Sequence, residues 1–126
     1  MVGLLERHRV RFVCLAILCM SLALLAVSFA TSDRGQTVFG ASLGADYIGF
    51  YAAATILNTA APDRLYDFAL QDEIYHTVLP SDEGHLPFFH PPFVALAFRP
   101  LARLPYAWSF AAWLLLSAAH AVSALN

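Results

Sequence analysis

An uncharged run of twenty residues, Phe12 to Thr31, constrains this chain more than any other feature. A helix of that length extends about 30 Å, which matches the hydrocarbon core of a bilayer. A second uncharged run extends from Ala107 to Leu125, with Trp108 and Trp113 toward its start. Aromatic side chains gather in this way at membrane surfaces. The two runs predict transmembrane helices over 12–31 and 107–125.

Composition supports the same environment. The 126 residues are 60% hydrophobic and 13% charged, whereas an average soluble domain is about half apolar and about a quarter charged. The net charge of −2 gives no indication of a nucleic-acid partner. We therefore expect an all-α integral membrane protein whose first partner is the lipid bilayer.

The basic residues before the first run predict its orientation. Arg7, Arg9 and Arg11 stand next to it, so the positive-inside rule places the N-terminus in the cytoplasm and residues 32–106 outside the cytoplasm. The membrane that we expect is the plasma (inner) membrane. The alternative is a cleaved signal peptide, with Ser28 to Ala30 as a loose cleavage site. The run is longer than the roughly 7–15 apolar residues of such signals.

The cysteines and histidines are the side chains to consider for a disulfide, a metal site or another functional site. Cys14 and Cys19 are about 7.5 Å apart along a helix, so we expect no disulfide between them. His120 lies about 20 Å along the second helix, where a polar residue is a functional candidate or meets a neighbouring helix. His76 and His85 lack partners at metal-ligand spacing. We expect no metal site and no cofactor.

Short helices are predicted within 32–106. Ala45 to Thr59 predicts a helix, because its apolar residues recur at helical spacing and form one face. The residues of this face are Tyr47, Phe50, Tyr51, Ala54 and Leu57. Such a helix can lie flat at the membrane interface. Residues 63–79 predict a second helix with Leu70, Ile74 and Val78 as its apolar stripe. Residues 80–84 predict a polar turn.

Prolines organise the remainder of this segment. Residues 87–92 are expected to be extended, and Pro92 suits the first position of a short helix that continues to Phe98. Arg99 to Pro105 then redirects the chain into the second span. Arg99 and Arg103 either extend to the membrane interface or hold a lipid phosphate.

Several stretches together, in this order between two spans, resemble glycosyltransferase family 87 of the GT-C superfamily, over roughly residues 12–120. The matching stretches are Asp46 to Ala53, Leu65-Tyr66-Asp67 with Gln71, Phe89-His90-Pro91-Pro92, Pro100-Leu101 with Leu104-Pro105, and Trp113 to Ser117. At His90 the family more often has tyrosine. Typical members are considerably longer and have many more spans, so the chain resembles their N-terminal portion.

The resemblance implies a GT-C fold and transfer of a hexose, with mannose favoured, from a polyprenyl-phosphate donor to a sugar or glycolipid acceptor outside the cytoplasm. It implies that Asp46, the acidic residue soon after the first helix, is the catalytic base. Tyr47, Tyr51, His90, Arg99 and Arg103 are then the expected substrate-binding residues. Because much of the substrate cavity would be missing, we expect the 126 residues alone to be inactive.

Other roles remain open for these acidic residues and for the chain. Asp46 also suits a helix N-cap, Asp67 suits a cap or helix-dipole partner at the second helix, and Asp33 lies in a Ser-Asp-Arg-Gly turn. The first alternative function is a two-span membrane protein without enzymatic activity, which assembles with a larger complex. The second is a protein released or anchored after signal cleavage.

Overall fold

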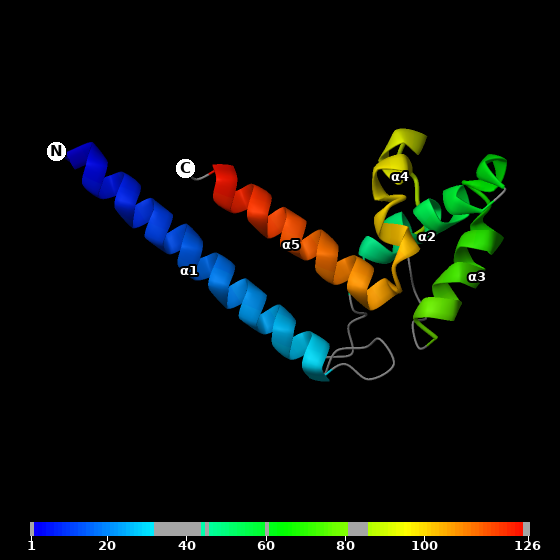
Figure 1. Ribbon diagram of the computed structural model, residues 1–126, viewed down its shortest axis with the longest axis horizontal. Helices are drawn as coiled ribbons and strands as arrows, with labels where there is room; N and C mark the ends of the chain where they lie inside the picture. Colours follow the sequence, from blue (N-terminus) through cyan, green and yellow to red (C-terminus); the bar gives the residue numbers. More distant parts are fainter. Residues whose placement is uncertain (1, 32–43, 45, 60, 81–85, 125–126) are drawn as a thin grey trace.

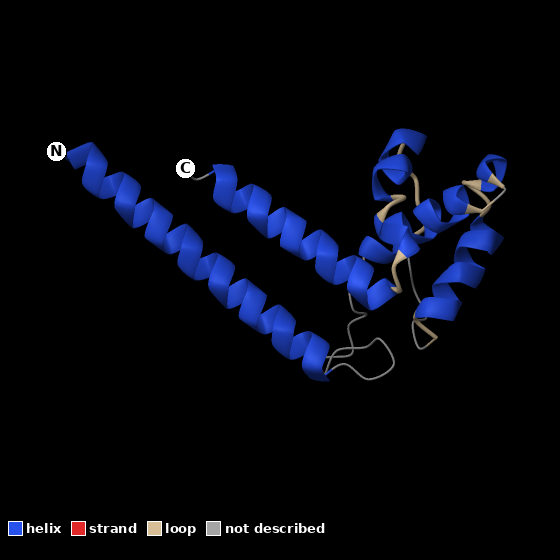
Figure 2. Cartoon of the chain, in the orientation of Figure 1, coloured by secondary structure: helices blue, strands red, loops and turns tan. Residues whose placement is uncertain are grey.

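The computed structural model describes residues 2–31, 44, 46–59, 61–80 and 86–124, and every regular element in these ranges is helical (Figures 1 and 2). The all-helical prediction is therefore confirmed for this part of the chain. The elements are α1 (Val2–Thr31), α2 (Tyr47–Asn58), η1 (Pro62–Arg64), α3 (Phe68–Val78), α4 (Pro92–Phe98), η2 (Leu101–Arg103) and α5 (Tyr106–Ala124).

Two of these helices, α1 and α5, are long and apolar enough to cross a membrane, over Arg9–Ser28 and Tyr106–Ala124. They run in opposite directions, with the N- and C-termini at the same end (Figure 1). The core helix of a soluble protein is mostly buried, yet the structure covers none of the α1 window and 11% of the α5 window. Their apolar surfaces are open to lipid or to other helices.

The short helices pack around α2. Its neighbours are α3, α4, α5, η1 and η2, and it buries Ile48, Ile56 and three consecutive alanines, Ala52 to Ala54. Alanine side chains let helices approach on several sides at once. Of the apolar residues predicted to share one face, Tyr47 and Ala54 are buried and the other three are partly buried. The protein itself therefore covers much of this face, and a position of α2 at the membrane interface stays a prediction.

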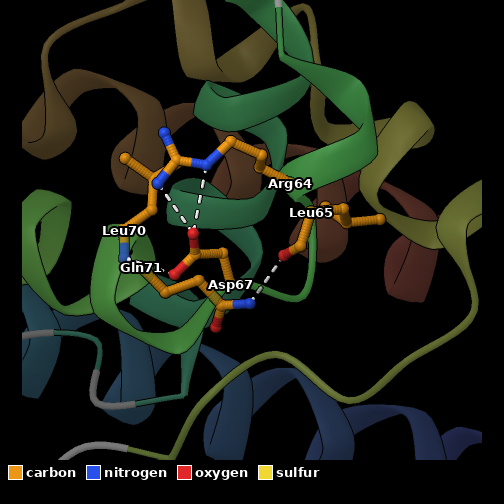
Figure 3. A network of polar contacts seen from close by, with 5 residues as sticks. All are labelled: Arg64, Leu65, Asp67, Leu70 and Gln71. Atoms are coloured by element: carbon orange, nitrogen blue, oxygen red, sulfur yellow. Dashed lines mark hydrogen bonds and ion pairs between the residues drawn. The ribbon is translucent and has the colours of Figure 1, made fainter.

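The second predicted helix is interrupted. Residues 62–64 form η1, and α3 begins only at Phe68, because Asp67 has extended backbone angles and caps α3. Its carboxylate accepts a hydrogen bond from Leu70 N at 3.2 Å and two from Arg64, at 2.7 and 3.1 Å (Figure 3). The predicted capping role of Asp67 is confirmed.

The buried face of α3 differs from the predicted stripe. Gln71, Tyr75 and the following Leu79 are buried, whereas Leu70, Ile74 and Val78 are only partly covered. The buried face is shifted by one residue, or about 100° around the helix. Tyr75 and Leu79 pack against Ile48 of α2, so the position of α2 determines which side of α3 is covered.

Gly44 joins the start of α2 to the start of α5. Its φ is +71°, and a Cβ there would lie 2.8 Å from the Tyr106 hydroxyl and 3.1 Å from the Phe110 ring. Its carbonyl accepts hydrogen bonds from Tyr47 N, Ile48 N and the Tyr106 hydroxyl. Glycine alone suits both this backbone conformation and this space. The turn predicted at Asp33 and most of the turn predicted over 80–84 lie outside the described residues.

Candidate functional site

Asp46 lies directly before α2 with an exposed side chain. Its backbone is in the right-handed helical region (φ −83°, ψ −29°), and its side chain makes no hydrogen bond to the amides of the helix. An N-cap residue usually has extended angles, which turn its side chain back onto those amides. The carboxylate of Asp46 is therefore not occupied by capping, although the positive end of the α2 dipole still favours a negative charge there.

Two cavities adjoin Asp46. The first, of about 300 Å³, lies between the first turn of α2 and the extended segment 86–90; its walls are Asp46, Gly49, Phe50, Leu86, Pro87, Phe88, Phe89 and His90. The second, of about 260 Å³, lies between α2 and α5; its walls are Gly44, Asp46, Tyr47, Phe50, Phe110 and Trp113. Asp46 is the acidic side chain in both walls, and the rest of each wall is largely aromatic.

The aromatic wall of the first cavity is stacked. Phe50 stacks on His90 with ring centroids 5.0 Å apart and an interplanar angle of 18°. Phe88 meets the edge of the same imidazole at 5.6 Å. The Tyr66 hydroxyl donates to the carbonyl of His90 at 3.0 Å. The structure thus places His90 and Asp46, both predicted site residues, on one cavity.

Gln71 holds the segment that carries this wall. Its side-chain nitrogen donates to the Leu65 carbonyl at 2.7 Å, and its oxygen accepts from Phe88 N at 2.8 Å. The first of these bonds is visible in Figure 3. Both partners and Gln71 itself are buried. One side chain therefore connects the η1 turn, α3 and the cavity wall.

The two predicted substrate-binding tyrosines serve mainly as contacts between helices. Tyr47 is 3% exposed, and its hydroxyl shares a 2.6 Å hydrogen bond with Ser109 of α5. The Tyr51 hydroxyl donates to the Leu104 carbonyl at 3.0 Å. Burial raises the pKa of both phenols above the ordinary value, so both stay neutral. Because its hydroxyl already bonds Ser109, Tyr47 can contact a ligand only where it lines the second cavity.

Of the two predicted cationic residues, Arg99 lies away from the carboxylate. Arg99 pairs with Asn58 through two hydrogen bonds, from its Nε to the side-chain oxygen at 3.1 Å and from the Asn58 amide to the Arg99 carbonyl at 3.0 Å. Asn58 ends α2, which places it about 18 Å from Asp46 along the helix. Arg103 is exposed in η2. The structure does not bring Arg99 and Asp46 to one reacting centre.

Three residues that shape this region are not among the site residues that the sequence predicts. Gln71 and Ser109 are buried polar residues, and Phe50 joins the walls of both cavities. Gln71 lies one helical turn after the cap residue Asp67, on the same side of α3. Its backbone partners, Leu65 and Phe88, are 6 and 17 residues away in the chain, so a local pattern does not reveal its role. Among the described residues no group of three His, Cys, Asp or Glu is placed to hold a metal ion.

Comparisons with protein-family models, with curated proteins and with solved structures find no match to this chain. The arrangement around Asp46 is therefore the main basis for a functional proposal.

Proposed function

We propose that this chain carries the first outer loop of a membrane glycosyltransferase, with Asp46 as the general base. Its donor is a polyprenyl-phosphate-linked hexose, and its acceptor is a hydroxyl of a sugar or glycolipid outside the cytoplasm. The observation that carries the proposal is the carboxylate of Asp46. It is exposed, makes no capping bond and lines two aromatic cavities. The second of these cavities is bounded by the first turns of α5, an apolar helix long enough to span a membrane.

The chemistry requires one carboxylate at such a position. An acceptor hydroxyl must lose its proton as it attacks the anomeric carbon, and a positioned base accelerates this step. The leaving lipid phosphate needs no proton, so a second acid is not required. Attack opposite the phosphate inverts the anomeric centre.

The cavities suit the two ends of such a donor. Ligand sites are mostly apolar with a few placed polar groups, and the apolar face of a sugar ring packs well on aromatic walls such as Phe50, Phe88 and His90. The second cavity is bounded by Phe110 and Trp113 of α5. Because α5 is a candidate span, we assign this cavity to the lipid-linked end of the donor. Arg99 is too far from Asp46 to bind the leaving phosphate, which leaves Arg103 as the cation assigned to it.

The test is transfer of radiolabelled mannose from polyprenyl-phosphate mannose in membranes that contain the protein expressed from its complete reading frame. Asp46→Asn keeps the size of the side chain and removes the base, so we expect transfer to fall by about 10²–10⁴-fold at unchanged expression. Asp63→Asn changes an exposed aspartate in η1, beyond the far end of α2, and is expected to leave transfer unchanged. Full transfer by Asp46→Asn would refute the role of Asp46.

A non-enzymatic role in a membrane complex is the second candidate, favoured by the uncovered surface of α1. Leu25 of α1 packs against the cluster around Tyr47 and Phe110, but none of the window Arg9–Ser28 is buried, which leaves most of this window available to other spans. Stable co-purification with one other membrane protein, together with absence of mannosyl transfer from both wild type and Asp46→Asn, would favour this role.

A further inference from the structure

The seven residues of α4 (Pro92–Phe98) are apolar on every side, but the protein covers only one side of them. Ala95, Val94 and Phe98 pack against α2 and its neighbours. Phe93, Leu96 and Ala97 are exposed, the first two by 68% and 50%. At 100° per residue these three share the opposite side of the helix. A helix that is apolar all round belongs in a protein core or in lipid.

Charge divides the short helices into two layers. Residues 62–78, which form η1 and α3, contain four acidic residues, whereas residues 86–124 contain none and have two arginines, Arg99 and Arg103. The helix α2 lies between α3 and α4. Figure 1 shows α4 on the side of α2 toward the end of the molecule that holds both termini, and α3 on the other side. The layer that has no acidic residue thus faces back along α5, and the acidic layer faces away from it.

A short connection in the chain leads from α4 to another exposed aromatic residue, at the start of α5. Only η2 and a few flanking residues separate the two helices, and Trp108 in the first turn of α5 is 70% exposed. A tryptophan at the end of a span is typical of the membrane interface.

We propose that the surface formed by Phe93, Leu96 and Ala97, here called the α4 face, inserts into the outer lipid leaflet beside the first turns of α5. The occupant is the bilayer itself, with Arg99 and Arg103 at the level of the anionic headgroups, where guanidinium groups bind phosphate. The proposal rests on α5 crossing the membrane, and it is independent of the role of Asp46.

Spin labels at single cysteines test the proposal in the full chain, with Cys14 and Cys19 changed to alanine, in phosphatidylcholine–phosphatidylglycerol vesicles. The labels are placed by Phe93→Cys, Leu96→Cys and Ala97→Cys on the α4 face and by Thr77→Cys on the exposed side of α3. Oxygen partitions into lipid and a nickel chelate stays in water. We expect labels on the α4 face to collide more with oxygen, and the label at residue 77 to collide more with nickel.

Leu115→Cys, on an exposed position of α5, reports whether the span itself is in lipid. If the label at 115 is in lipid while those on the α4 face collide with nickel as often as the label at 77, the α4 face is in water and the proposal is wrong. Low collision rates with both reagents on the α4 face would show a protein contact, and would also overturn it. A label at 115 that is open to nickel removes the premise and refutes the proposal with it.

Discussion

At the scale of single residues, Gln71 is the buried polar side chain on which the cavity wall depends most directly. Its amide satisfies one donor and one acceptor of the backbone that are both buried, at Phe88 and Leu65. A buried backbone group without a partner costs free energy, because it has lost its hydrogen bonds to water. Gln71 therefore stabilises the fold and also fixes the position of segment 86–90.

Replacing Gln71 with leucine is expected to destabilise the protein. Each orphaned backbone group costs about 1–3 kcal/mol, and new apolar contacts of leucine offset part of the sum, so we expect a loss of about 2–4 kcal/mol. Urea unfolding in detergent micelles, followed by tryptophan fluorescence, measures it. Thr77→Ala, on the exposed side of α3, is the control and is expected to change stability little. Equal stability of the two variants would contradict the bridging role.

The sequence identifies some site residues more readily than others. Asp46 and His90 are candidate site residues through the family resemblance of the stretches that contain them, since the local pattern at Asp46 alone favours a helix N-cap. The burial of Tyr47 is not visible there, since it depends on Ser109, which is 62 residues away in the chain. The separation of Arg99 from Asp46 likewise follows from the pairing of Arg99 with Asn58.

At the scale of elements, helix positions follow from the sequence and helix faces do not. The predicted helix over 107–125 agrees closely with α5 (Tyr106–Ala124), and the one expected after the prolines agrees with α4. Helix ends reflect local signals such as Pro92 at the first position of α4. The buried side of α3 reflects where α2 lies, and no local pattern contains that information.

The cap of α3 predicts a dependence of stability on pH. The Arg64 guanidinium, and after it the Leu70 amide, hold the pKa of Asp67 below its ordinary value. Folding therefore favours the ionised carboxylate. The stabilisation is fully present above the unfolded pKa of about 3.9, and is lost as the pH falls through the lower folded pKa.

Asp67→Asn and Arg64→Gln remove this ion pair from its two sides. Urea unfolding over a pH series is expected to show each variant less stable than wild type near neutral pH. The difference is expected to shrink below about pH 4, where the carboxylate becomes protonated. A difference that stays constant to the lowest pH would show that the ion pair does not contribute.

At the scale of the whole molecule, the two long helices hold α2, α3 and α4 near one of their ends (Figure 1). Because α1 and α5 run in opposite directions (Figure 1), two membrane crossings put both termini on one side and α2, α3 and α4 toward the other. The arginines at positions 7, 9 and 11, near the start of α1, predict by the positive-inside rule that this first side is the cytoplasm. A candidate base at Asp46 would then face donors on the outer surface.

This arrangement predicts a labelling pattern in spheroplasts. In the Cys14→Ala, Cys19→Ala background, Thr77→Cys is expected to react with a membrane-impermeant maleimide, whereas epitope tags fused before Met1 and after Asn126 resist external protease until the membrane is opened. If α1 and α5 both cross the membrane, the two tags are expected to behave alike, because two crossings separate them. Protection of residue 77 together with exposed tags would reverse the orientation.

A mature N-terminus near Thr31 by mass spectrometry would instead show that α1 is a cleaved signal, leaving α5 as the one remaining candidate span among the described residues.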